Sequence, residues 1–144
     1  MNAATLLLTS ALALLAPMAA SAGERLQVIE RALTDTTVDL GAKGDSVGDL
    51  LTFGNPIYDA TNKTKLGSDQ GYCVRVVVGK SWECIWTLML ADGQITVEGP
   101  FFDTGDSLMV VTGGTGKYAG AKGDMKLHAR DAKATAYDFV YELL

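Results

Sequence analysis

The sequence is poor in the residues that most often carry charge-based recognition or metal chemistry. It has one histidine and two cysteines among 144 residues, and its 12 Lys and Arg are outnumbered by 17 Asp and Glu, for a net charge of −5. No cluster of basic residues is present, so we expect no binding to nucleic acid or to an anionic membrane surface. A membrane-spanning helix needs about 20 consecutive apolar residues. The longest apolar run, residues 5–16, is shorter than that.

The motifs of common cofactor and metal sites are also missing. His128 lies in the polar run Lys-Leu-His-Ala-Arg and has no partner pattern for a Ser–His–Asp arrangement or a zinc site. The Gly-rich segment 113–117 ends in Lys, but Val111 stands where a phosphate-binding loop needs Gly, and Tyr118 stands where it needs Ser or Thr. The sequence therefore predicts no metal and no cofactor, and we interpret the segment as a turn between strands.

The N-terminus has the pattern of an export signal. The apolar run 5–16 is followed by Pro17 and by Ala20-Ser21-Ala22, a small-x-small cleavage pattern. No Lys or Arg precedes the run, so a structural N-terminal helix is the alternative. We expect a signal peptide over residues 1–22, cleaved after Ala22, a secreted or periplasmic protein, and a single domain over residues 23–144.

Residues 69–99 contain both cysteines and both tryptophans, and their pattern predicts three consecutive antiparallel strands. Asp92-Gly93 is the dipeptide preferred in a two-residue type I′ turn, which would place Leu90 opposite Ile95. One face of this hairpin is apolar, so further strands must cover it.

Other short extended segments surround this stretch. They are 25–33, 47–53, 57–66, 108–112, 124–129 and 136–143. Residues 34–46 read as a connection, and Gly99-Pro100 is expected to end the third central strand. Seven to nine short strands indicate an all-β barrel or sandwich, and the count favours an eight-stranded antiparallel closed barrel, which has no exposed edges.

The two cysteines lie on neighbouring predicted strands. A tight turn at Val78-Gly79 would place Cys73 opposite Cys84 and Arg75 opposite Trp82. The first pair predicts either a disulfide, as is common in exported proteins, or a free Cys73 thiol in a pocket. The second pair allows a cation–π contact.

Four segments resemble the allene oxide cyclases of plants. They are 46–58 (Ser-Val-Gly-Asp-Leu-Leu-Thr-Phe-Gly-Asn-Pro-Ile-Tyr), 71–73, 93–100 and 111–120. The last of these, with the Ala-Lys-Gly that follows it, is also similar to the dirigent proteins. The resemblance implies an eight-stranded antiparallel barrel with a partly apolar lumen, which is commonly a homotrimer.

The resemblance also implies roles for individual residues. Asn55 and Cys73 match a cyclase asparagine that holds a water on the substrate epoxide and a cysteine that shapes the substrate. The family's Glu-x-Asn pair on the first strand has no clear counterpart, because Glu30 is followed by Arg31 and Ala32.

Two classes of function remain open at this point. The first is a barrel that binds a small hydrophobic or phenolic molecule and steers its reaction, either as an intramolecular isomerase of the allene oxide cyclase kind or as a dirigent-like guide. Its ligand would contact Phe53, Arg75, Trp82 and Trp86. The second is a non-catalytic structural or interaction barrel, with its lumen filled by side chains such as Phe53, Trp82, Trp86 and Phe102.

Overall fold

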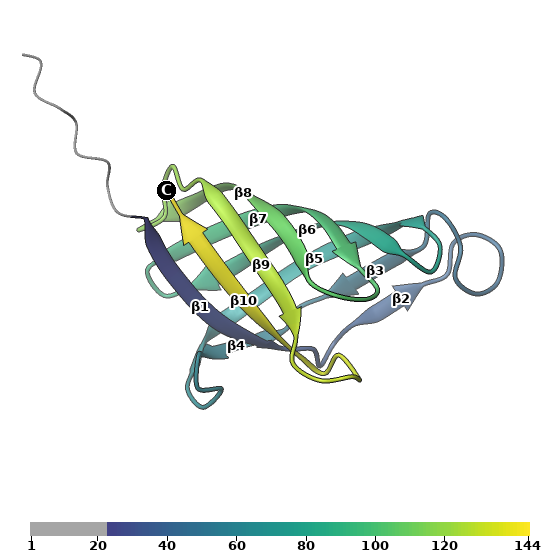
Figure 1. Cartoon of the computed structure of the whole chain (residues 1–144), viewed down its shortest axis with the longest axis horizontal. Coiled ribbons are helices and arrows are strands. Elements are labelled where there is room, and N and C mark those ends of the chain that lie inside the picture. The colour runs from purple at the N-terminus through teal and green to yellow at the C-terminus, as the bar shows by residue number, and fades with distance from the viewer. Residues whose placement is uncertain (1–22) are drawn as a thin grey trace, which may run out of the picture.

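The computed structural model describes residues 23–144, and every regular element in that range is a β-strand (Figure 1). The strands are β1 (Glu24–Arg31), β2 (Thr36–Val38), β3 (Leu50–Phe53), β4 (Pro56–Asp59), β5 (Lys65–Val77), β6 (Ser81–Leu90), β7 (Gly93–Phe102), β8 (Ser107–Gly116), β9 (Gly123–Ala129) and β10 (Ala136–Leu143). No helix among these residues is long and apolar enough to cross a membrane. The expected signal peptide, residues 1–22, lies outside the described residues.

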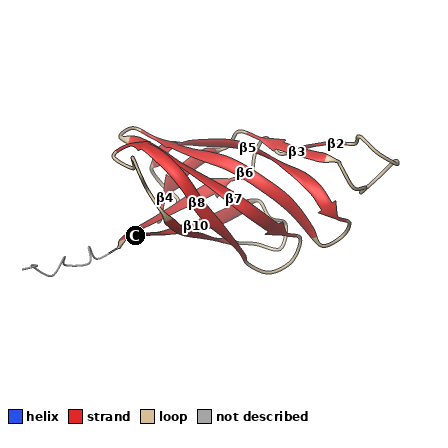
Figure 2. Ribbon diagram, turned by 90° about the horizontal axis from the view of Figure 1, so that it is seen from above, coloured by secondary structure: helices blue, strands red, loops and turns tan. Residues whose placement is uncertain are grey.

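The strands form one antiparallel sheet that closes on itself. Their order is β2-β3-β5-β4-β1-β10-β9-β8-β7-β6, and pairing of β5 with β6 completes the circle. Strands β3 and β4 lie end to end along the same edge of β5, and β2 pairs only with β3. The closed wall therefore has eight strand positions, one of which is shared by β3 and β4. This confirms the predicted barrel and rules out two separate sheets. Figure 2 shows β2 and β3 extending toward one end of the molecule.

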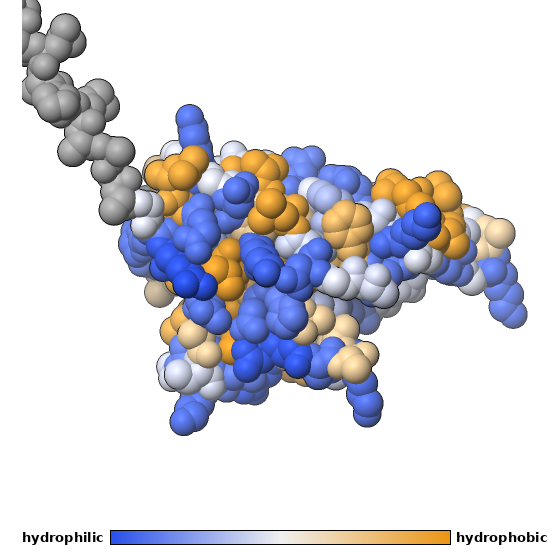
Figure 3. Space-filling view, in the orientation of Figure 1, coloured by the Kyte–Doolittle hydropathy of each residue, from blue (hydrophilic) through white to orange (hydrophobic). Residues whose placement is uncertain are grey.

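The barrel interior follows from strict alternation along the strands. On β6, Trp82, Cys84, Trp86 and Leu88 are buried, whereas Glu83 between them is exposed. The centre is aromatic: the Trp86 ring lies 5.9 Å from that of Phe53 and 5.5 Å from that of Phe139. In Figure 3, polar side chains cover much of the outer wall, and apolar groups appear at both ends of the molecule.

The β6–β7 hairpin has a different tip from the predicted one. Leu90 pairs with Gly93 and Leu88 with Ile95, so the turn is formed by Ala91 and Asp92. Gly93 instead allows close approach to β8, because a Cβ there would meet the Thr115 carbonyl oxygen at 2.2 Å. The shift is two residues, so the predicted apolar face is unchanged.

Strand β7 does not end at Gly99-Pro100 as expected. It continues to Phe102, with Pro100 opposite Glu83 on β6. Pairing with β8 reaches only as far as Glu98, so the other edge of β7 is free at Pro100 and no ladder partner there needs its missing N–H. The continued alternation turns Phe101 inward and leaves Phe102 42% exposed, so Phe102 does not fill the lumen.

Candidate functional site

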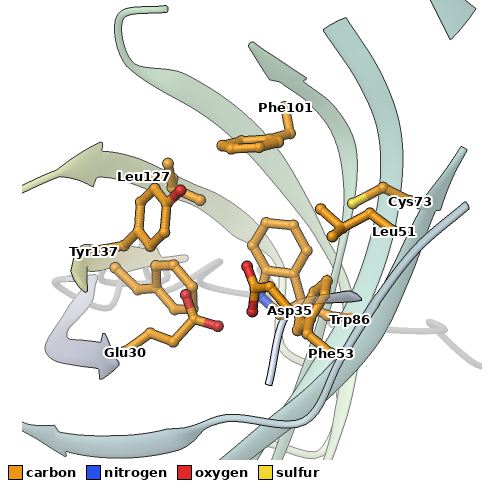
Figure 4. Close-up of a pocket in the computed structure, with 10 residues that line it drawn as sticks. Glu30, Asp35, Leu51, Phe53, Cys73, Trp86, Phe101, Leu127 and Tyr137 are labelled. Carbon is orange, nitrogen blue, oxygen red and sulfur yellow. The ribbon is translucent and has the colours of Figure 1, made fainter. Parts of the chain in front are cut away.

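One cavity opens into the barrel interior among aromatic side chains (Figure 4). Its volume is about 30 Å³. That is room for about one or two waters, whereas ligand pockets usually hold 300–1,000 Å³ as an order of magnitude. Its lining residues are Glu30, Asp35, Leu51, Phe53, Cys73, Trp86, Phe101, Leu127, Tyr137 and Phe139. Two acids thus face a wall that is otherwise almost entirely apolar.

Glu30 reaches the interior because it shares the inward side of β1 with Val28. It pairs with Tyr137 on β10 and with Ile57 on β4, and only 5% of it is exposed. The sequence comparison found no clear counterpart for the family's first-strand glutamate. The structure nevertheless places Glu30 on the first strand with its carboxyl group at the cavity (Figure 4).

Asn55 lies at the joint between β3 and β4 and holds the site together. Its backbone N–H donates to the Asp69 carbonyl oxygen at 3.1 Å and its carbonyl accepts from the Asp69 N–H at 2.9 Å, which continues the ladder across the joint. Its side-chain Nδ2 donates to Glu30 Oε1 at 2.8 Å and to Asp35 Oδ1 at 2.7 Å.

The carbonyl end of the same side chain is equally occupied. Asn55 Oδ1 accepts from the N–H of Leu33 at 2.9 Å, from the N–H of Thr34 at 3.0 Å and from the Thr34 hydroxyl at 3.1 Å. An amide has two N–H donors and one carbonyl acceptor, and all are engaged by protein groups. In this arrangement Asn55 positions the two acids, and it has no spare donor for a water on a substrate.

Glu30 and Asp69 form a pair of buried carboxyl groups. Burial, followed by the charge of Asp69, raises the pKa of Glu30 well above its ordinary value. Burial also raises the pKa of Asp69 to about 6, against the lowering effect of hydrogen bonds with Glu30 and the Asn55 backbone. Two adjacent carboxylates in a dry interior cannot both ionise cheaply. The pair therefore holds a proton to a higher pH than exposed carboxyl groups do. We call Glu30, Asp35, Asn55 and Asp69 the Glu30 cluster.

Three buried polar atoms beside this cluster have no hydrogen-bond partner among the described residues. They are Asp69 Oδ2, Trp86 Nε1 and the Tyr141 hydroxyl. The pKa of Tyr141 is raised far above its ordinary value by burial and then by the charge of Asp69. Burial, with a contribution from Glu30, raises the pKa of Tyr137 to about 12. Both tyrosines therefore keep their protons at neutral pH. Unpartnered buried polar atoms are uncommon in folded proteins and call for an explanation.

The structure brings together some of the sequence-predicted site residues. Phe53, Cys73 and Trp86 line the cavity, and Asn55 lies behind it, 1% exposed, holding the two acids that do. Cys73 is bonded to Cys84, with a Cα–Cα distance of 4.0 Å, so the disulfide rather than the free thiol is present. The catalytic roles given to Asn55 and Cys73 stay predictions.

Arg75 and Trp82, the other two predicted ligand contacts, are not at this cavity. They pair across β5 and β6 as the predicted turn required, with the guanidinium carbon 3.9 Å from the Trp82 ring. Arg75 Nε lies 2.6 Å from Asp45 Oδ1, and its Nη1 lies 2.7 Å from Asp103 Oδ1. The buried guanidinium is thus already held by two carboxylates and an aromatic ring. We call these four residues the Arg75 cluster.

Sequence reasoning missed four residues of the site: Asp35, Asp69, Tyr137 and Tyr141. The alternation of inward and outward side chains along a strand could have revealed three of them. Asp69 is separated by an even number of residues from the inward-facing Cys73, and the two tyrosines alternate along β10 with buried Phe139. Asp35 lies in the connection between β1 and β2, where no periodicity exists to reveal it.

An eight-stranded antiparallel barrel with acidic groups at an aromatic cavity defines the class to which the chain belongs. A family model described as "Allene oxide cyclase" matches residues 29–136. The chain belongs to this family of allene oxide cyclase and dirigent-like barrels.

Solved structures of the same fold belong to proteins with different activities. A pyocyanin demethylase is 24% identical, with a TM-score of 0.74, over 84% of this chain and 100% of that one. A pterocarpan synthase dirigent protein is 13% identical, with a TM-score of 0.70, over 88% and 96%. AbnU, an exo-specific intermolecular Diels-Alderase, is 17% identical, with a TM-score of 0.64, over 84% and 98%. At these identities the likeness shows the fold, and function must be argued from the site.

Proposed function

We propose that the barrel binds a small hydrophobic or phenolic molecule at the cavity and steers its reaction by confinement and by the proton on Glu30. The observation that carries the proposal is the buried carboxyl group of Glu30, which faces an aromatic cavity and has a raised pKa. A raised-pKa acid in such surroundings can donate a hydrogen bond or a proton to a bound molecule. A fixed donor also stabilises developing negative charge more strongly in a dry site than in water.

The aromatic wall supports the other half of the proposal. Phe53, Trp86 and Phe139 form a contiguous rigid surface that can hold a flat ring in one orientation. Orientation alone can supply a large part of a rate enhancement or a stereochemical bias. The related cyclases, Diels-Alderases and dirigent proteins fit this mode of action, which needs no triad.

A ligand must enlarge the cavity to enter. Leu51, Phe53 and Phe101 are partly exposed side chains of its lining, and Asp35 is exposed in the adjoining connection. We propose that these residues form the mouth and move aside on binding.

The test is stereochemical. In the first arm, freshly generated fatty-acid allene oxide is supplied to the protein, and the enantiomeric excess of the cyclopentenone is measured. In the second arm, an oxidase generates phenoxy radicals, and the stereochemical bias of the coupled product is measured. We expect an excess of one stereoisomer in one of the two arms, and we expect Glu30→Gln to lower that excess. If the protein is an isomerase, the same substitution should slow the isomerisation by about 100-fold. Glu98→Gln, an exposed change on β7, is the matched control. Products identical to those of the buffer control in both arms would reject the proposal.

A non-catalytic barrel with a filled lumen is the second candidate, and the cavity volume of about 30 Å³ favours it. A ligand that binds only the folded state raises the thermal midpoint, and the rise grows with the logarithm of the ratio of ligand concentration to dissociation constant. If no compound in a panel of lipids and phenolics raises the midpoint, this second function is the better one.

Export and assembly remain proposals as well. We propose a secreted or periplasmic location, supported by the Cys73–Cys84 disulfide, since such bonds persist in oxidising compartments. We also propose a homotrimer, on the family resemblance alone, and light scattering would measure the molar mass.

A further inference from the structure

The charges around the cavity are of one sign. Glu30 and Asp35 line it, and the Asp69 carboxylate lies beside Glu30. Among the described residues, no Lys, Arg or His lines this cavity. Two acidic side chains thus line a small space, a third lies beside one of them, and no basic residue of the lining balances them.

The nearest basic residues in the sequence are already engaged. Arg31 follows Glu30 and so points to the other side of β1, where its guanidinium lies 3.7 Å from the centre of the Tyr58 ring and bonds to Asn62. Arg75 is held by Asp45, Asp103 and Trp82. Neither guanidinium neutralises the acids at the cavity.

A second observation points to a ligand. Asp69, Trp86 and Tyr141 are 1%, 3% and 0% exposed, and each leaves a polar atom without a partner. Trp86 is itself part of the cavity wall. The unpartnered Nε1 of Trp86 is an N–H donor in the cavity wall, and a basic ring nitrogen of a bound molecule would accept from it.

The aromatic side chains of the cavity wall also favour a positively charged ligand. The face of a tryptophan attracts cations most strongly among the aromatic side chains, and desolvation strengthens the attraction. A flat cation is also weakly hydrated, so it loses less than a compact ammonium ion on entering an apolar site.

Resting on the proposed function, we infer that the molecule taken by this cavity is a flat aromatic bearing a positive charge or a basic ring nitrogen, and that aromatic or aliphatic carboxylates are excluded. A carboxylate at the cavity would face Asp35, with Asp69 beside Glu30 nearby, and would meet no counter-ion in the lining. The inference therefore narrows the proposed function: it argues against a substrate whose carboxylate must enter the barrel.

The test uses three two-ring probes of similar size: N-methylquinolinium, 1-naphthol and 1-naphthoate. Their dissociation constants are measured by titration calorimetry on the full-length mature protein. We expect N-methylquinolinium to bind at least tenfold more tightly than 1-naphthoate, with 1-naphthol between them. Asp35→Asn and Asp69→Asn should each weaken N-methylquinolinium several-fold and leave 1-naphthol nearly unchanged. Asp124→Asn, on the exposed outer side of β9, removes the same charge away from the cavity and should change neither.

Each result decides a different question. If 1-naphthol or 1-naphthoate binds as tightly as the cation, the charge inference is wrong and the proposed function stands. If the cation binds but neither cavity substitution weakens it, binding lies elsewhere and the inference is also wrong. If no probe binds, both the inference and the ligand-binding function are rejected in favour of the filled barrel.

Discussion

The Arg75 cluster and the Glu30 cluster belong to one barrel, yet their charges are arranged in opposite ways. In the Arg75 cluster one guanidinium meets two carboxylates and an aromatic face, so every charge has a counterpart. In the Glu30 cluster carboxyl groups meet one another through a single amide, and one carboxylate oxygen has no partner.

The difference separates a structural arrangement from a reactive one. Paired opposite charges hold the local structure. Like charges forced together raise each other's pKa and keep a proton available, which is the condition of a general acid. The predictions below test whether the two clusters differ in this way.

The largest expected effect is on stability at the Arg75 cluster. Arg75→Met removes a buried cation and leaves Asp45 and Asp103 facing each other without it, so we expect a loss of about 3 to 4 kcal/mol in the free energy of unfolding. Urea denaturation measures the loss. Arg25→Met, which breaks the exposed pair with Glu142, should cost less than about 1 kcal/mol. Equal costs for the two substitutions would show that the Arg75 cluster is not the buried structural unit described here.

The Cys73–Cys84 disulfide lies between the Arg75–Trp82 pair and the Gly71–Trp86 pair on β5 and β6. One residue pair separates it from each of them. It joins residues 11 apart, and closing a loop of that length stabilises a protein by about 3 kcal/mol in the chain-entropy model. We expect the double change Cys73→Ala with Cys84→Ala to lower the urea midpoint accordingly. The wild-type protein under reducing conditions should behave in the same way, and an unchanged midpoint in both would contradict the prediction.

Local patterns in the sequence were enough to predict the barrel and part of its register. Alternation and turn residues gave the strands, and counting back from Val78-Gly79 placed Cys73 opposite Cys84 and Arg75 opposite Trp82, as the structure confirms. Local preference failed at Asp92-Gly93, because contact with β8 decided how Gly93 is used. It failed at Pro100 because the free edge of β7 tolerates a missing donor.

The site could not be predicted to the same extent, since it depends on closure of the barrel. Glu30 meets Asn55 and Asp69 only because β4 brings β1 and β5 into one wall. Parity can show that Glu30 and Asp69 point inward, but no local pattern shows that they point at each other. The family resemblance singled out Asn55 as a site residue, and the structure places it behind the cavity. Its hydrogen bonds to Glu30 and Asp35 are contacts that only the folded chain reveals.

The smallest expected effect is a pH dependence that belongs to the Glu30 cluster alone. The folded-state pKa of Asp69, about 6, lies above the ordinary value of 3.8, so the folded chain binds this proton more tightly than the unfolded chain does. The resulting stabilisation is complete below about pH 4 and is lost as the pH rises through about 6, for a total of roughly 3 kcal/mol, of which about 2 kcal/mol falls between pH 4.5 and 7. We expect Asp69→Asn to flatten the fall in unfolding free energy between pH 4.5 and 7, measured by urea denaturation, whereas Arg75→Met should lower stability equally at every pH in that range. If wild type and Asp69→Asn show the same slope, Asp69 ionises as an ordinary aspartate, and the two clusters do not differ in the way proposed.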